Sequence, residues 1–372
     1  MKFIVSTGSL LKQLQMIQGV ISTSTVLPIL EDFLFEIKPG ELTISGTDLE
    51  TSMSTKIKIE AKDKGKIAIP GKILVETLKT LPEQPITFSV NEKTYAIEIT
   101  SENGKYKLSG ENGDDYPRIP IAENVQEVTI PAAVLGKAIA KTIFAVSTDE
   151  LRPAMTGVYF QLDKDGITFV ATDAHKLVRY KRTDTTTNNP STFIVPKKAL
   201  NLLKSSLPGD DTSVNISYNN SNAFFTFGDV NLTCRLIDAR YPDYNAVIPV
   251  DNNKRLTIGR DEFQNSLKRI SIFSNKTTHQ VVLKISGSDL NVSAQDLDFS
   301  NEASERLNCT YEGDDLEIGF NAKFLVEMLG VMDGDEIRLE MASSTRAGIL
   351  LPLVQEENEE VLMLVMPVML NT

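Results

Sequence analysis

The chain has 372 residues, of which 41% are hydrophobic and 24% are charged, a composition typical of soluble globular proteins with two or three domains. No run approaches the ~20 consecutive apolar residues of a membrane helix, and no signal-peptide pattern precedes the first strand, so we expect a cytoplasmic protein that binds no membrane. The net charge of −12 argues at first against a nucleic-acid partner, because phosphate binding depends on Lys and Arg.

Six amphipathic segments, each entered from a short β-strand, follow one another along the chain. Strands that start at Phe3, Val128 and Leu256 open three similar sections, and a second strand-then-helix unit lies halfway along each. The six predicted helices cover residues 9–20, 71–81, 132–146, 197–207, 260–274 and 322–332. Alternating polar and apolar runs between them predict antiparallel strands.

The three sections also end alike. Pro117, Pro242 and Pro367 close them at intervals of about 125 residues, which indicates one module written three times. We therefore predict an α+β fold of three tandem similar domains, over residues 1–120, 121–250 and 251–372. Each domain should place two helices on antiparallel sheets.

Charge is distributed unevenly. The six predicted helices together carry a net positive charge, although the whole chain is acidic. Lysines that decorate solvated helix faces would explain this for one helix, but the same bias recurs in all three sections. Domains with helices inward would form an arc, and two arcs would close a ring with basic helices inside. The predicted DNA-facing residues are Lys72, Lys137, Lys141, Lys197, Lys198, Lys204 and Lys268.

Nothing in the sequence indicates catalysis, a metal site or a cofactor. Cys234 and Cys309 are the only cysteines, and we interpret them as small buried hydrophobes. Asp173 and its counterparts Asp48 and Asp296 recur in each section, which favours turn chemistry over an active site. A hydrolase built on these aspartates and an extracellular β-repeat protein are the alternatives. Absence of turnover would exclude the hydrolase.

Several stretches carry a resemblance to a known family. They are LPIL from Leu27, GTDLE from Gly46, ATDAHKL from Ala171, DARYPDY from Asp238, GFNAKFLVEML from Gly319 and the VMPVML tail from Val365. In order and spacing, the chain resembles the bacterial DNA polymerase III beta subunit, a sliding clamp, over essentially its full length.

The resemblance implies a head-to-tail homodimeric ring that encircles duplex DNA without regard to sequence and uses no cofactor. Such a ring tethers the replicative polymerase for processive synthesis, and it docks the clamp loader and repair polymerases through short peptide motifs. Lys72, Lys197 and Lys198 match positions where the family presents basic residues to DNA. Ser24 stands where the family often has arginine, so no contact is expected from it.

The resemblance also implies a peptide pocket between the second and third domains. Its matching residues are Met155, Thr172, His175, Leu177, Pro242, Val247, Leu364, Met366 and Pro367. On pattern alone, the tail could instead be only the last core strand. Ala246, Met369 and Lys176 replace residues that are often arginine in the family, so we expect a less basic pocket.

The implied dimer contact joins Tyr106 and Leu108 of one copy to Ile272 and Phe273 of the next. Acidic residues near Asp298 and Glu302 should face Lys105 and Lys107 across it. Alternatively, Ile272 and Phe273 belong to an ordinary intradomain core.

Overall fold

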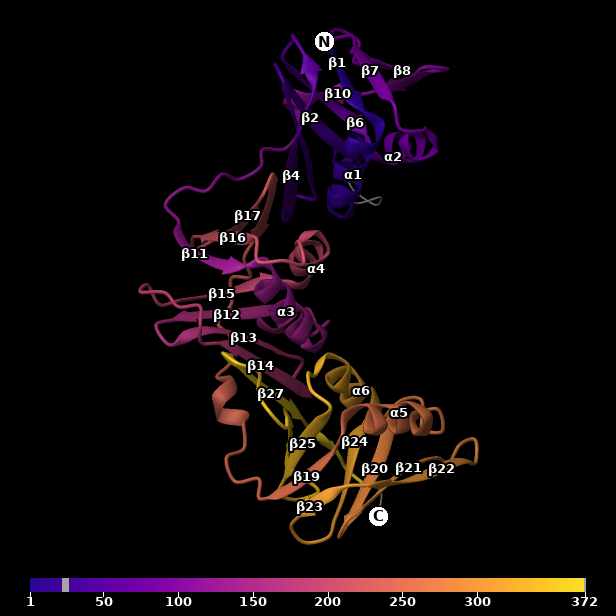
Figure 1. Cartoon of the computed structure of the whole chain (residues 1–372), viewed down its shortest axis with the longest axis vertical. Coiled ribbons are helices and arrows are strands. Elements are labelled where there is room, and N and C mark those ends of the chain that lie inside the picture. The colour runs from indigo at the N-terminus through magenta and orange to yellow at the C-terminus, as the bar shows by residue number, and fades with distance from the viewer. Residues whose placement is uncertain (22–26, 371–372) are drawn as a thin grey trace. The chain divides into compact units, whose positions relative to one another are not determined.

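The computed structural model describes residues 1–21 and 27–370, so Ser24 lies outside the described residues (Figure 1). The chain divides into two compact units. The first comprises Met1–Gly136 and Lys198–Leu236, and the second comprises Lys137–Lys197 and Ile237–Thr372. The middle third of the chain therefore contributes to both units.

The first unit holds two antiparallel sheets. Its five-stranded sheet has the order β5 (Glu60–Ala61), β1 (Lys2–Ser6), β7 (Pro85–Val90), β8 (Ala96–Thr100) and β9 (Lys105–Ser109). Its nine-stranded sheet has the order β10 (Glu111–Asn112), β6 (Gly65–Pro70), β2 (Asp32–Lys38), β3 (Glu41–Thr47), β4 (Thr51–Lys58), β18 (Val230–Arg235), β17 (Asn222–Phe227), β16 (Ser213–Tyr218) and β11 (Gln126–Pro131).

The second unit repeats this plan. Its nine-stranded sheet has the order β15 (Ser191–Pro196), β12 (Gly157–Asp163), β13 (Gly166–Thr172), β14 (Lys176–Arg182), β27 (Glu359–Val365), β26 (Gly348–Pro352), β25 (Glu336–Met341), β19 (Lys254–Gly259) and β23 (Thr310–Glu312). Its five-stranded sheet has the order β22 (Asn301–Asn308), β21 (Asp289–Asp296), β20 (Gln280–Ser286), β24 (Leu316–Asn321) and β28 (Pro367–Val368).

All six predicted helices are confirmed, and the fold is α+β as predicted. They are α1 (Thr7–Ile17), α2 (Gly71–Thr80), α3 (Ala132–Thr142), α4 (Lys197–Ser206), α5 (Arg260–Ser271) and α6 (Ala322–Val331). Three of them end at least three residues earlier than predicted. Short 3-10 helices follow two of these, η1 (Gln18–Val20) after α1 and η4 (Ile143–Ala145) after α3, and the third, α5, ends at Ser271. The remaining 3-10 helices are η2 (Pro28–Glu31), η3 (Gly113–Asp115), η5 (Pro153–Thr156) and η6 (Tyr244–Val247).

Local side-chain chemistry fixes where the helices begin. The Ser6 hydroxyl accepts a hydrogen bond from the Ser9 amide at the start of α1, and the Asn321 side chain accepts one from Lys323 at the start of α6. The first residue of α2 is Gly71. A larger residue would fit poorly at this position, because its Cβ would lie 3.0 Å from the carbonyl oxygen of Glu31. Figure 1 shows α5 and α6 side by side over the sheet that holds β20, β21 and β24.

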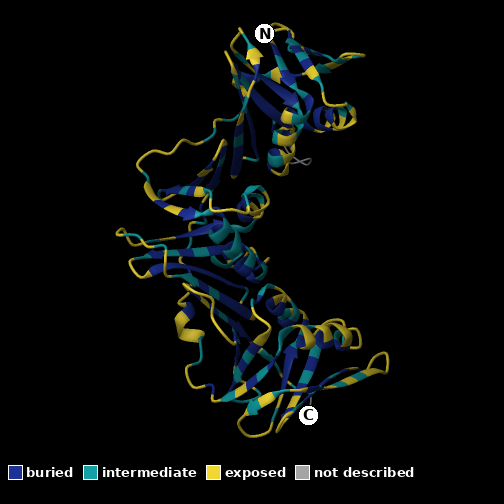
Figure 2. Cartoon of the chain, in the orientation of Figure 1, coloured by how far each residue is buried: buried dark blue, intermediate teal, exposed yellow. Residues whose placement is uncertain are grey.

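Aromatic side chains from separate strands fill the cores. In the first unit, the rings of Phe3 and Phe88 stack with centroids 4.7 Å apart, and Phe35 packs against both. In the second unit, the Phe160 ring lies 5.2 Å from that of Phe193. These residues occupy the buried positions of alternating strands, as the period of two predicts (Figure 2).

Strand pairing carries each nine-stranded sheet from one repeat into the next. In the first unit β4 pairs with β18, with Met53 opposite Leu232, and in the second β14 pairs with β27, with Val178 opposite Met363. We call these two antiparallel pairings the repeat junctions. In the described part of the chain, β9 and β22 are sheet edges with one neighbour each.

Asp32 is a buried carboxylate at the start of β2. Its main-chain oxygen accepts a hydrogen bond from the Tyr116 hydroxyl at 3.1 Å, whereas its Oδ2 has no hydrogen-bond partner among the described residues. Burial, with smaller contributions from Glu111 and Glu31, raises the pKa of Asp32 from 3.8 to about 7. The folded chain therefore binds this proton more tightly than the unfolded chain.

Replacing Asp32 with Asn should remove a pH-dependent destabilisation. Because the folded-state pKa lies above the unfolded value, the contribution of Asp32 to stability falls as the pH rises between those values. We expect Asp32→Asn to gain about 2–3 kcal/mol relative to wild type between pH 5 and pH 8, in urea denaturation followed by circular dichroism. The exposed Asp229→Asn is the control. A stability difference that does not change with pH would contradict the assignment.

Candidate functional site

Five of the predicted DNA-facing lysines lie at helix surfaces. Lys72, Lys198, Lys204 and Lys268 are exposed, and Lys197 is half-buried at the start of α4. Lys268 Nζ donates to Gln264 Oε1 at 3.1 Å, and Lys198 Nζ is paired with Asp48 Oδ2. Their ammonium groups are accessible to an anion, and exposed pairs of this kind cost little to exchange.

Lys72 also lines a groove beside α2. The groove has a volume of about 390 Å³, and its lining includes Phe33, Val75 and Lys79. Two lysines therefore project along one side of α2, spaced by seven positions. This arrangement can attract a polyanion without fixing one geometry for it.

Lys141 and Lys137 are committed to contacts inside the second unit. The Lys141 side chain is 2% exposed, and its Nζ donates to the Val331 carbonyl at 2.9 Å and lies 2.8 Å from Asp333. Lys137 Nζ lies 3.0 Å from Asp333 and 2.8 Å from the buried Glu359. Burial disfavours the Asp333 carboxylate, but hydrogen bonds from these two lysines hold the pKa of Asp333 below its ordinary value.

The prediction for Lys141 therefore needs correction. A buried ammonium held by a carbonyl and a carboxylate has no free surface for a phosphate, so Lys141 does not belong to a DNA-facing set. Lys137 is half-buried and doubly paired, which makes it a weak candidate. Lys141 ties α3 to the end of α6 and to Asp333, and Lys137 ties α3 to Asp333 and to β27.

The Asp173 carboxylate binds backbone amides of its own turn, as its recurrence in the repeats predicted. Asp173 Oδ1 accepts hydrogen bonds from the amides of His175 and Lys176, both at 2.9 Å, and Asp48 Oδ1 accepts from Glu50 and Thr51 in the same way. These carboxylates hold tight turns with positive φ at Ala174 and Leu49. The turn interpretation is thus confirmed.

Two of the nine predicted pocket residues belong to one apolar cluster of the second unit. Leu177 and Leu364 are buried in it with Tyr241, Tyr244 and Ile349. Pro242, Val247, His175 and Met366 are exposed, while Met155 and Pro367 are half-buried and Thr172 is buried. The tail therefore contains a core strand, β27, followed by the exposed Met366 and Met369 on either side of the half-buried strand β28.

Phe324 is a residue of this site that the sequence did not single out. The His175 ring stacks on it with centroids 6.4 Å apart, and the Lys176 ammonium lies 4.4 Å from its centroid. Lys176 is buried and also reaches Glu327 Oε2 at 2.6 Å. Phe324 lies inside the GFNAKFLVEML motif, but only the fold brings it to His175.

The candidate dimer residues lie on the edge strand β9 of the first unit and directly after helix α5 of the second unit. Ile272 is 76% exposed and Phe273 is also exposed, so their interpretation as intradomain core is wrong. Tyr106 and Leu108 are half-buried on the edge strand β9. In the second unit, the exposed Glu302 lies at the start of the edge strand β22, and the exposed Asp298 lies in the turn before it.

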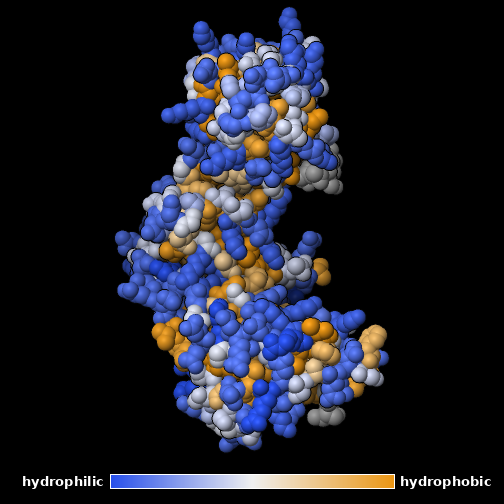
Figure 3. Space-filling model, turned by 45° about the vertical axis from the view of Figure 1, so that its right-hand side comes forward, coloured by the Kyte–Doolittle hydropathy of each residue, from blue (hydrophilic) through white to orange (hydrophobic). Residues whose placement is uncertain are grey.

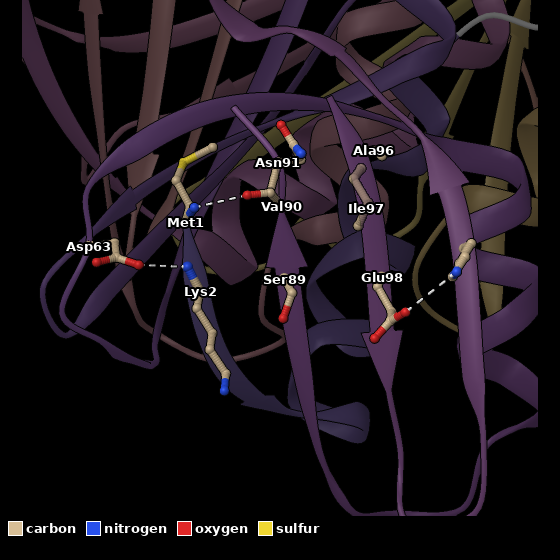
Figure 4. Close-up of a pocket in the computed structure, with 10 residues that line it drawn as sticks. Met1, Lys2, Asp63, Ser89, Val90, Asn91, Ala96, Ile97 and Glu98 are labelled. Carbon is tan, nitrogen blue, oxygen red and sulfur yellow. Dashed lines mark hydrogen bonds and ion pairs between the residues drawn. The ribbon is translucent and has the colours of Figure 1, made fainter. Parts of the chain in front are cut away.

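A further groove lies at the N-terminus, but its polar groups already bind one another (Figure 4). The Met1 ammonium donates to the Val90 carbonyl at 2.9 Å, and the Lys2 amide donates to Asp63 at 2.8 Å. Among the described residues, no group of His, Cys, Asp and Glu could hold a metal ion. Within the same residues, no helix is long and apolar enough to cross a membrane.

Family models for the DNA polymerase III beta subunit match three consecutive stretches. The N-terminal domain model matches residues 1–120, the central domain model 129–243 and the C-terminal domain model 245–369. Beta sliding clamps of Staphylococcus epidermidis and Staphylococcus aureus are each 29% identical to the chain, over 99% of both sequences.

Solved structures agree with these matches. The DNA polymerase sliding clamp of Bacillus subtilis aligns with a TM-score of 0.95 at 25% identity, and the Pseudomonas aeruginosa DnaN clamp bound to griselimycin with 0.94 at 26%. Each alignment covers 100% of both chains. Sliding clamps are non-enzymatic processivity factors of DNA replication, which agrees with the prediction of no catalytic site. The chain therefore belongs to the DNA polymerase III beta subunit family, the bacterial sliding clamps.

Proposed function

We propose that two copies of this chain join head to tail into a ring that encircles duplex DNA and tethers the replicative polymerase in the cytoplasm. The domain division at 1–120, 121–250 and 251–372 is part of this proposal. One observation carries it. The edge strands β9 and β22 hold the sheet positions that β18 and β4, or β27 and β14, hold at the repeat junctions.

Pairing β9 of one copy with β22 of the next would repeat the internal junction between copies. Both edges would then be covered, which removes exposed main-chain donors and acceptors that invite uncontrolled association. β9 carries the exposed Lys105 and Lys107, and β22 carries the exposed Glu302, so the edges have complementary charge. Tyr106 and Leu108 on one side, with Ile272 and Phe273 on the other, supply the apolar contact.

DNA would be held by weak contacts that ignore base sequence. Phosphate contacts position a protein on a duplex without reading it, and long flexible lysines make such contacts without a fixed geometry. The lysines that support this role are Lys72, Lys197, Lys198, Lys204 and Lys268. Lys141 is left out because it is buried.

Charge reversal at Lys197 and Lys198 should shorten the residence of the ring on DNA. Removing two phosphate contacts and adding two repulsive charges should cut the half-life on nicked circular DNA by about tenfold or more at physiological salt. Surface plasmon resonance on closed and nicked circles measures this directly. The melting temperature should fall only a little, because Lys197 is half-buried rather than buried and the exposed Lys198 loses a single ion pair, to Asp48.

Lys62→Glu with Lys64→Glu is the matched control. This pair makes the same change in net charge at exposed positions outside the helices of the first unit. Equal loss of retention in both double variants would show that only total charge matters. Such a result would contradict the assignment of α4 to the DNA surface.

Partner proteins would bind the apolar cluster of the second unit through short peptides. The clamp loader, the replicative polymerase and repair polymerases are the proposed partners. Leu177 and Leu364 belong to this cluster, Pro242 directly follows its member Tyr241 in the sequence, and Met366 lies two residues after Leu364. The exposed Pro242, Val247 and Met366 would add apolar surface for a peptide side chain. The Pseudomonas aeruginosa relative binds griselimycin, and we extend this ligand to the present chain as a probe.

The pocket of this chain should prefer acidic peptides less strongly than the pockets of family members that carry arginine at these positions. Ala246 and Met369 carry no charge, and the Lys176 ammonium is already paired with Glu327 at 2.6 Å. Apolar contact therefore supplies most of the affinity. Methionine in the rim allows related peptides to be accommodated by repacking.

Val247→Glu should weaken griselimycin binding by about tenfold or more, because the ligand would bury an unpaired carboxylate. Isothermal titration calorimetry gives the dissociation constant. Val250→Glu is the control, since Val250 is 98% exposed and lies three residues beyond the pocket set. If the Val247→Glu and wild-type proteins bind griselimycin with equal affinity, Val247 does not line the proposed site.

A further inference from the structure

Two large apolar side chains project from the turn between β21 and β22. Leu297 is 74% exposed and Phe299 is 65% exposed, and both lie in the turn that joins the two strands. Figure 3 shows that much of the visible surface of the chain is hydrophilic, with smaller hydrophobic areas between. The Lys276 ammonium lies 5.3 Å from the Phe299 ring and helps to fix its position. Together these two side chains offer apolar surface that a second protein surface could cover.

The two repeat junctions show what such a turn contacts. At the first, Asp48 in the turn before β4 pairs with Lys198, the second residue of α4. At the other, His175 in the turn before β14 stacks on Phe324, the third residue of α6. In both units, the turn before the joining strand therefore lies against the first turn of the next repeat's second helix.

The same contact between a turn and a helix can be predicted for the edge strand β22. β22 holds the position of β4 and β14, so Leu297 and Phe299 lie in the corresponding turn. The helix that follows in the cycle of repeats is α2 of a second copy. Since Leu74, Leu200 and Leu325 are equivalent, Ile73 corresponds to Ala199 and to Phe324. Ile73 is 47% exposed on α2.

We propose that Leu297 and Phe299 of one copy pack on Ile73 of a second copy, as an apolar contact beside the β9 and β22 pairing. This inference rests on the proposed head-to-tail dimer and names a surface that the edge strands alone do not include. The internal junctions use charges at this place, Asp48 with Lys198 and Lys176 with Glu327. The turn before β22 instead presents two exposed apolar side chains on either side of the exposed Asp298, and the apolar part of the contact between copies should depend little on salt.

Sedimentation equilibrium on single and double variants tests the contact. Phe299→Glu and Ile73→Lys should each raise the dimer dissociation constant by about 100-fold, roughly tenfold for each of the two identical interfaces. The double variant places a carboxylate opposite an ammonium at both interfaces. The dimer dissociation constant of the double variant should be at least about tenfold lower than that of either single variant, and it should rise with salt concentration.

Val354→Glu, at an exposed apolar site away from this turn in the sequence, is the control and should leave the dimer unchanged. Circular dichroism checks that every variant is folded. If wild type dimerises and Phe299→Glu has no effect, the inference is wrong while the ring proposal stands. If the double variant shows no recovery, the pairing with Ile73 is wrong. A wild-type chain that stays monomeric at tens of micromolar would overturn the proposed dimer itself.

Discussion

Main-chain pairing across the repeat junctions is the constraint on which the rest of the structure depends. β4 with β18 and β14 with β27 make each nine-stranded sheet continuous through two repeats. A strand edge inside a protein must find partners for its amides and carbonyls. The pairing therefore fixes which helices and turns of neighbouring repeats meet. It leaves the edge strands β9 and β22, whose free amides and carbonyls a second copy could pair with.

Charged side chains then make each junction specific. Lys141, Lys137, Asp333 and Glu359 form a partly buried network in the second unit, and such networks cost desolvation that close ion pairs must offset. Their geometry favours one packing of α3 on its neighbours. The positive charge of the helices thus serves two purposes, since some lysines hold the protein together and others remain free to attract phosphate.

The sequence predicted the features that depend on local pattern. The six helices, the antiparallel strands and the aspartate turns at Asp48 and Asp173 all follow from periodicity and short-range hydrogen bonding. It could not predict that Lys141 is buried, because the Val331 carbonyl that its ammonium binds lies 190 residues away. Asp32 and Phe324 were missed for the same reason, because their burial and ring contacts arise from strands and turns that are distant in sequence.

Topological enclosure of DNA is the central claim, and one measurement tests it most directly. Wild-type protein is placed on a nicked circle by its clamp loader, freed of unbound protein, and followed before and after a restriction enzyme cuts the circle. A closed ring should stay on the circle and leave once free ends exist. Equal retention on cut and uncut DNA, or equally rapid loss from both, would contradict the account.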